Sequence, residues 1–145
     1  MTPARAALLL LRLTLGALLS VAGALKLRDP TAFATEIANY QLVPALAPYL
    51  AALLPAIEIV IGAGLIVLPR AWRRGAAAAA LVLFVMFTGA VSSAYFRRIN
   101  IDCGCFGTGG GPIDALTLLR NLALTAGTLA VLRFDRANGR AGASG

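Results

Sequence analysis

Residues 75–96 read GAAAAALVLFVMFTGAVSSAYF, a run of 22 residues without one charged side chain. The hydrocarbon core of a bilayer is about 30 Å thick, and about 20 apolar residues in a helix are needed to cross it. Three further stretches are almost as apolar and carry one charged residue each: 6–25 with Arg12, 49–68 with Glu58, and 115–132 with Arg120. The sequence therefore predicts an all-α fold, an integral membrane four-helix bundle.

The composition of the whole chain agrees with this prediction. Hydrophobic residues make up 59% of the 145 residues and charged residues 13%, whereas a soluble domain is about half apolar and about a quarter charged. The same balance excludes intrinsic disorder, which requires few apolar residues. Four spans with short connections account for residues 1–145 as a single domain. The small and polar residues of 135–145 predict a flexible tail.

The net charge of +7 would indicate nucleic acid binding in a soluble protein, but here the basic residues sort by loop. Seven lie before the first span, between the second and third spans, and after the fourth: Arg5, Arg70, Arg73, Arg74, Arg133, Arg136 and Arg140. The other two loops hold four basic and four acidic residues: Lys26, Arg28, Arg97, Arg98, Asp29, Glu36, Asp102 and Asp114. Because cytoplasmic loops carry an excess of Lys and Arg, both termini are predicted to be cytoplasmic and the last loop extracytoplasmic. The expected location is a bacterial cell (inner) membrane. The lipid bilayer is an expected partner, and nucleic acid is not.

The first apolar stretch has a second interpretation. Arg5, the apolar run and Ala22-Gly23-Ala24 are typical of a signal peptide with its cleavage site. Arg12 argues against cleavage, because it falls in the middle of what would be the apolar core of that peptide. Cleavage would leave three spans.

The charged residues inside the spans predict an intramembrane polar cluster. An ionised side chain in the bilayer costs at least about 2.5–3.5 kcal/mol, so such residues usually face the bundle interior and pair. Glu58 and Arg120 differ in depth by about 3 Å at 1.5 Å per residue. We therefore expect a buried Glu58–Arg120 pair, with Arg12 as a second partner and Asn121 beside it. Such a cluster is either a structural clasp or a polar pocket for a ligand headgroup or a proton path.

Small residues follow two of these charges at helical spacing. Gly16, Ser20 and Gly23 follow Arg12, and Gly62 follows Glu58 by one turn. Such residues mark helix faces that another helix approaches closely.

The strongest local signal is the stretch DCGCFG at residues 102–107. Cys103 and Cys105 around Gly104 can close a small disulfide ring, because glycine tolerates a strained backbone. Strained and exposed disulfides are exchangeable, and an extracytoplasmic location permits oxidation. We expect Cys103 and Cys105 to be the catalytic residues, supported in the loop by Gly104, Phe106 and Gly107. A structural staple and a soft-metal thiolate site are the alternatives.

The absence of some residues restricts the chemistry further. The chain has no histidine, which excludes Ser-His-Asp and Cys-His catalysis and histidine-ligated metals. Two cysteines cannot supply a four-thiolate metal site within one chain. Thiol chemistry is the most prominent remaining class.

The stretch CGCFG at residues 103–107, after a third span, resembles the signature of the MauE/DoxX-like redox-associated membrane proteins. Further similarities to that family run along almost the whole chain: Arg12 in the first span, Gly23 with Lys26 at its end, Phe33 and Tyr40 in the first loop, Pro55 with Glu58 in the second span, and Arg120-Asn121 at the start of the fourth. The resemblance implies a four-helix integral membrane protein. It also implies a link to methylamine metabolism, through maturation of the disulfide-rich small subunit of methylamine dehydrogenase.

These observations favour a membrane protein that exchanges thiols and disulfides on its outer face. Cys103 and Cys105 would react with an exported thioredoxin-like or disulfide-containing protein. Regeneration of the pair requires an electron partner. A quinone near the outer helix ends is one candidate, with these neighbours: Arg120, Asn121, Phe106 and Tyr95.

Two other classes of function stay open. The first is a non-catalytic accessory or assembly subunit whose last loop docks a partner. The second is a small transporter that uses a pocket at Glu58.

Overall fold

The computed structural model describes residues 2–99 and 112–141. Within these ranges the chain forms five α-helices and one 3₁₀ helix: α1 (Pro3–Lys26), α2 (Pro30–Asn39), η1 (Pro44–Leu46), α3 (Ala47–Val67), α4 (Arg70–Phe96) and α5 (Ala115–Ala141). Four segments of the described chain are long and apolar enough to cross a membrane, and they contain α1, α3, α4 and α5. The predicted all-α fold with four membrane-spanning helices is confirmed.

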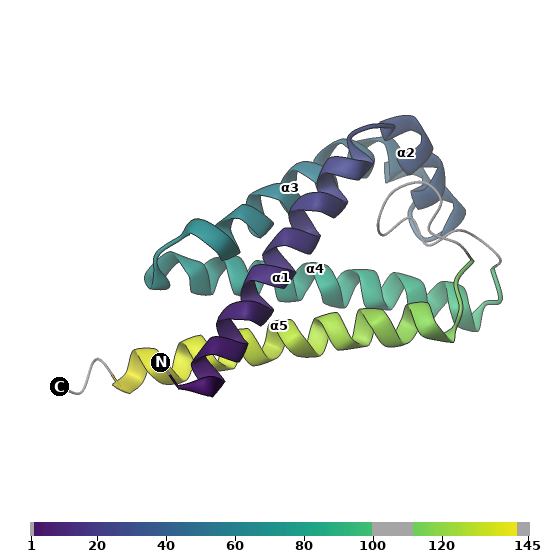
Figure 1. Ribbon diagram of the computed structural model, residues 1–145. Coiled ribbons are helices and arrows are strands. Elements are labelled where there is room, and N and C mark those ends of the chain that lie inside the picture. The colour runs from purple at the N-terminus through teal and green to yellow at the C-terminus, as the bar shows by residue number, and fades with distance from the viewer. Residues whose placement is uncertain (1, 100–111, 142–145) are drawn as a thin grey trace.

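The helices extend beyond the predicted spans. The basic turn before residue 75 is helical, because α4 begins at Arg70. The helix α5 continues through the first part of the predicted tail to Ala141, and residues 142–145 lie outside the described residues. Both described chain ends lie at the end of the bundle where α3 turns into α4 (Figure 1). The membrane side of that end stays a prediction.

The polar stretch after the first span is not a plain loop, because it contains α2. Asp29 caps this helix, and its Oδ1 accepts a hydrogen bond of 2.9 Å from the backbone N–H of Ala32. Pro30 occupies the first helical position, where a missing N–H costs nothing. Phe33 is buried and packs α2 onto α3. The capped helix therefore covers one end of the bundle (Figure 1).

The bundle is built from two close helix pairs, α1 with α3 and α4 with α5 (Figure 1). A Cβ atom at Gly23 would lie 2.6 Å from the carbonyl oxygen of Pro55, and one at Gly62 would lie 2.6 Å from that of Gly16. The backbones of α1 and α3 can approach this closely only because these positions are glycine. The predicted close approach at the small residues is confirmed.

The remaining surface of the helices suits a lipid environment. Many large apolar side chains on the spans are exposed, including Leu53, Val60 and Val82. Trp72 is exposed at one end of the bundle, and Phe96 is exposed at the other. Aromatic residues at both ends of a bundle are typical of the two membrane–water interfaces.

Candidate functional site

A buried ion pair joins the end of α1 to the middle of α3. The Nζ atom of Lys26 donates a hydrogen bond of 2.5 Å to Oε1 of Glu58, and the two side chains are 1% and 0% exposed. The same Nζ atom lies 5.2 Å from the ring centroid of Phe33 on α2 and 5.0 Å from that of Phe87 on α4. The ammonium group therefore contacts side chains from three other helices.

The sequence-based prediction of a Glu58–Arg120 pair is wrong. The carboxylate of Glu58 binds Lys26, while Arg120 is exposed on α5. The sequence predicts Lys26 in an outer loop, but α1 continues through this residue. The contact of Gly23 with Pro55 places the last turn of α1 directly beside Glu58. Without Lys26, the two loops predicted to be extracytoplasmic carry three basic residues instead of four.

Arg12 is also not a partner of Glu58. At 1.5 Å per residue, it lies about 21 Å along α1 from Lys26. It lines a different cavity together with Arg73 and Asp135, where Asp135 attracts its guanidinium and Arg73 repels it. Arg12 thus lies at a different level of the bundle from Glu58, and the predicted cluster of Arg12, Glu58, Arg120 and Asn121 is not assembled.

Asn121 does lie close to Glu58. The two residues line the same cavity of about 20 Å³, and both are buried. The Nδ2 group of Asn121 donates a hydrogen bond of 2.9 Å to the carbonyl oxygen of Thr117, which orients the amide. Oε2 of Glu58 has no hydrogen-bond partner among the described residues. The cavity is lined mainly by apolar side chains, and its volume has room for one water molecule beside the two polar groups of Glu58 and Asn121.

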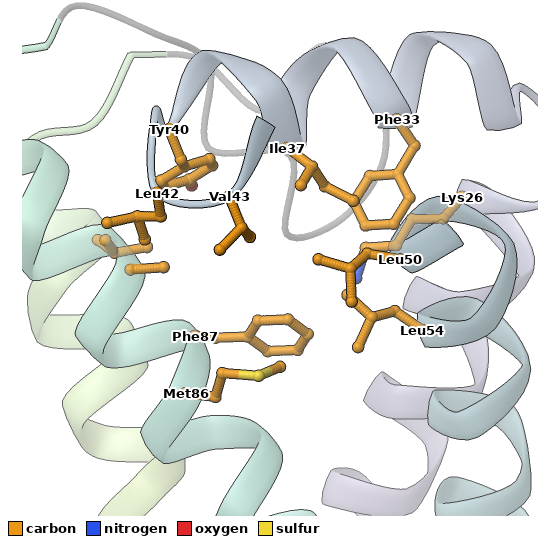
Figure 2. A pocket seen from close by; sticks show the side chains of 12 residues that line it. Lys26, Phe33, Ile37, Tyr40, Leu42, Val43, Leu50, Leu54, Met86 and Phe87 are labelled. Carbon is orange, nitrogen blue, oxygen red and sulfur yellow. The ribbon is translucent and has the colours of Figure 1, made fainter. Parts of the chain in front are cut away.

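A larger cavity, which we call the Lys26 cavity, adjoins the ion pair. It has a volume of about 140 Å³. Its lining comes from α1, α2, the segment before η1, α3 and α4: Lys26, Phe33, Ile37, Tyr40, Leu42, Val43, Leu50, Leu54, Met86, Phe87, Ala90 and Val91. Figure 2 shows these side chains around one shared space, with the nitrogen of Lys26 at its edge. Apart from Lys26 and the hydroxyl of Tyr40, the lining side chains are apolar.

Part of the lining also belongs to the outer surface of the molecule. Leu42, Val43 and Met86 each keep between 42% and 49% of their surface exposed. The Lys26 cavity can therefore be reached from the lipid-facing side of the bundle. A buried cation in an apolar cavity is suited to a flat apolar ligand that offers one hydrogen-bond acceptor.

The predicted catalytic stretch lies in the sequence between α4 and α5. Cys103, Cys105 and their neighbours Gly104, Phe106 and Gly107 lie outside the described residues. The segment before them is held in place by Arg97, whose Nη1 and Nη2 groups donate hydrogen bonds of 3.2 Å to the carbonyl oxygen of Tyr40 and to Oε1 of Gln41. Because Tyr40 also lines the Lys26 cavity, the end of α4 is fixed beside that cavity.

The segment after the cysteines is fixed by a helix cap. Oδ1 of Asp114 accepts hydrogen bonds from the backbone N–H and the hydroxyl of Thr117, at 2.7 and 2.9 Å. These bonds hold the pKa of Asp114 below its usual value, because they favour the ionised carboxylate. The start of α5 is therefore well defined directly after the predicted redox segment.

Comparison with known proteins identifies the family. The family model described as methylamine utilisation protein MauE matches residues 4–134. The chain belongs to the MauE family. The match covers all four spans and the segment with both cysteines, so the family resemblance of the sequence is confirmed.

A MauE-family relative is the methylamine utilization protein MauE of Paracoccus denitrificans. It is 44% identical to this chain over 119 residues, which are 79% of this chain and 63% of the relative. The chain thus spans less than two thirds of the length of that protein. No solved structure matches this MauE-family chain.

Lys26, Phe33 and Phe87 are the residues that reasoning from composition and spacing missed. Lys26 is flanked by Leu25 and Leu27, and no helix breaker occurs before Pro30. That pattern could have indicated a cation on the last helical turn instead of in a loop. The similarity to the family at Gly23, Lys26 and Phe33 pointed to the same place.

Proposed function

We propose that this MauE-family protein carries out thiol–disulfide exchange in the membrane and acts in methylamine utilisation. Cys103 and Cys105 supply the thiols, and the partner is an exported thioredoxin-like or disulfide-containing protein. In methylamine utilisation that partner would be the small subunit of methylamine dehydrogenase. The family match supports the pathway, and the Cys-Gly-Cys spacing supports the chemistry. The proposal places this loop on the extracytoplasmic side of a bacterial inner membrane.

The strongest structural support for the redox proposal is the Lys26 cavity. Oxidation of two thiols to a disulfide releases two electrons and two protons, and these must pass to an acceptor. A dry apolar cavity of about 150 Å³ is known to hold one benzene ring, and the Lys26 cavity measures about 140 Å³. We propose that it binds the ring of a membrane quinone, which accepts the two electrons and two protons and becomes a quinol.

The residues around the cavity fit this role. The ammonium group of Lys26 can donate a hydrogen bond to a ring oxygen, where negative charge develops on reduction. Phe33 and Phe87 offer ring faces for stacking. Leu42 and Val43 lie on the exposed part of the lining, where the isoprenoid tail would leave toward lipid.

Trapping of a mixed disulfide tests the thiol chemistry. The single variants Cys103→Ser and Cys105→Ser each leave one thiol, which should hold an exported partner as a stable mixed disulfide in one of the two. The double variant Cys103→Ser/Cys105→Ser should capture nothing and lose function. Full function of the double variant together with loss of function on loop deletion would instead establish an accessory or assembly subunit. Thiol labelling from each side of the membrane tests the predicted orientation in the same strains.

A separate experiment tests the quinone. Ala90 lines the Lys26 cavity, so Ala90→Phe should fill it and abolish reoxidation of the purified dithiol by a soluble ubiquinone analogue. Ala52 is an exposed alanine on α3, so Ala52→Phe is the matched control and should leave that rate unchanged. Equal rates of dithiol reoxidation in Ala90→Phe and Ala52→Phe would exclude the Lys26 cavity as the quinone site. No quinone-dependent reoxidation of the unmodified protein would exclude the acceptor itself.

The dimensions of the Glu58 site do not favour a transporter. The cavity shared by Glu58 and Asn121 measures about 20 Å³, which suits a water molecule but not an organic solute. One oxygen of Glu58 is already bound to Lys26. A proton-handling role beside the quinone suits this arrangement better than solute passage.

A further inference from the structure

A second large cavity lies at the opposite end of the bundle, where α1 begins and α3 turns into α4 (Figure 1). It has a volume of about 190 Å³, opens to the surface and is lined by α1, α4 and α5. Its charged lining residues are Arg5, Arg12, Arg70, Arg73 and Asp135. We call it the arginine cavity. It shares no lining residue with the Lys26 cavity and has no role in the proposed redox reaction.

The charges in the arginine cavity do not balance. Asp135 is the only acidic residue among the described lining residues, and both its carboxylate oxygens already accept hydrogen bonds of 3.3 Å from Arg73. Its carbonyl oxygen accepts another, of 2.8 Å, from Arg74. The Nε atom of Arg12 is buried without a hydrogen-bond partner among the described residues. Arg12 and Arg73 are partly buried and share the single carboxylate of Asp135, whereas Arg5 and Arg70 are exposed, so the described lining carries an excess of positive charge.

The helix ends add to this positive potential. Two helices begin here, α1 at Pro3 and α4 at Arg70, and neither has an acidic residue in its first turn. The N-cap side chains of both helices form no capping hydrogen bond. The partial positive charges of two helix N-termini therefore act on the same region as the arginines.

The rest of the lining is apolar. Leu8, Leu9, Val131 and Phe134 complete the arginine cavity, and Leu9 is also exposed on the lipid-facing surface. Trp72 is exposed near the start of α4, as is typical at the level of the lipid headgroups. The ligand must then combine an anion with a hydrocarbon chain. We infer that the arginine cavity binds an anionic phospholipid, with its phosphate among the guanidinium groups and an acyl chain along Leu8 and Leu9.

Lipid titration of the purified full-length protein, followed by native mass spectrometry, tests this inference. Phosphatidylglycerol should bind at least tenfold more tightly than zwitterionic phosphatidylcholine. A charge-assisted hydrogen bond contributes about 1.5–3 kcal/mol, so Arg12→Gln should weaken phosphatidylglycerol binding by about tenfold or more. Arg12→Lys keeps the charge but loses the bidentate geometry of the guanidinium. Its affinity for phosphatidylglycerol should lie between those of the unmodified protein and Arg12→Gln.

A second pair of variants keeps the test valid if Arg12→Gln does not fold. Arg5→Gln/Arg70→Gln removes two cavity arginines that have no assigned ion pair, and should weaken phosphatidylglycerol binding by at least tenfold. Arg28→Gln/Arg133→Gln removes the same charge from exposed positions outside the cavity and should bind like the unmodified protein. An equal loss of phosphatidylglycerol affinity in both double variants would refute binding at the arginine cavity. Inorganic phosphate that competes with the lipid at equal concentration would overturn the phospholipid assignment in favour of a free anion.

Discussion

Replacement of Lys26 by methionine tests whether the ion pair is what allows Glu58 to be buried. Methionine fills a similar volume between Phe33 and Phe87 and packs well on aromatic rings, so little packing is lost. The variant leaves a carboxylate that is 0% exposed without its cation. Removal of one partner from a buried pair costs about 3–5 kcal/mol. We expect Lys26→Met to lower the free energy of unfolding by about this amount.

The double variant separates the pair from its surroundings. Lys26→Met/Glu58→Leu replaces both charges by apolar side chains, a change that is often neutral or stabilising for a buried pair. We therefore expect it to be within about 1 kcal/mol of the unmodified protein, and a coupling energy of several kcal/mol between the two positions. Reversible unfolding in mixed micelles with dodecyl sulfate, followed by circular dichroism, measures all four free energies. Additive losses in the double variant would refute the reasoning, because they would show that each residue acts through packing alone.

Three further predictions follow from the same contacts. Gly23→Ala should lower the free energy of unfolding by about 1–3 kcal/mol in the same assay, because its Cβ would meet α3. Gly89→Ala, whose Cβ would have no atom within 4 Å, should leave this free energy unchanged or raise it by up to about 1 kcal/mol. Asp135→Asn should lose about 1.5–3 kcal/mol of stability in detergent, because it removes the charge that binds Arg73, and it should bind phosphatidylglycerol more tightly in native mass spectrometry. The carboxyl of Asp114 has a pKa below the usual 3.8, so its cap stabilises α5 above that pH and is lost as the pH falls through the lower folded value; the protection of the Thr117 amide, measured against its intrinsic exchange rate at each pH, should be unchanged at pH 5 and fall only in stronger acid.

The spans could be predicted from the sequence because membrane thickness sets a length that composition alone reveals. The helix faces of close approach were also predictable, since Gly16, Ser20 and Gly23 recur at helical spacing in the first span, but the sequence did not indicate which helix packs against them. The helix α2 was missed, although Asp29 followed by Pro30 is a helix-start signal. Its ten residues are too polar for a span, and a search for spans passes over them.

The identity of the buried pair was not predictable from depth alone. Arg120 and Glu58 are near one another in depth, but a helix has a rotation as well as a length. Asn121 takes the inward position on α5, so its neighbour Arg120 is turned outward. Only the packing of α1 on α3 brings Lys26 to Glu58. Spacing along one chain carries no information about the rotation of helices relative to one another.

The stability of the bundle does not explain why Lys26 and Glu58 are charged. An apolar pair of the same volume would hold α1 on α3 at least as well, because the cost of desolvating two charges offsets their attraction. The pair also lies between the Lys26 cavity and the water-sized cavity at Asn121. This location suits groups that donate a hydrogen bond on one side and exchange a proton on the other. The double apolar variant distinguishes the two explanations: a folded protein that still reoxidises its dithiol with quinone would leave the pair a purely structural role, whereas a folded protein without that activity would assign it to the reaction.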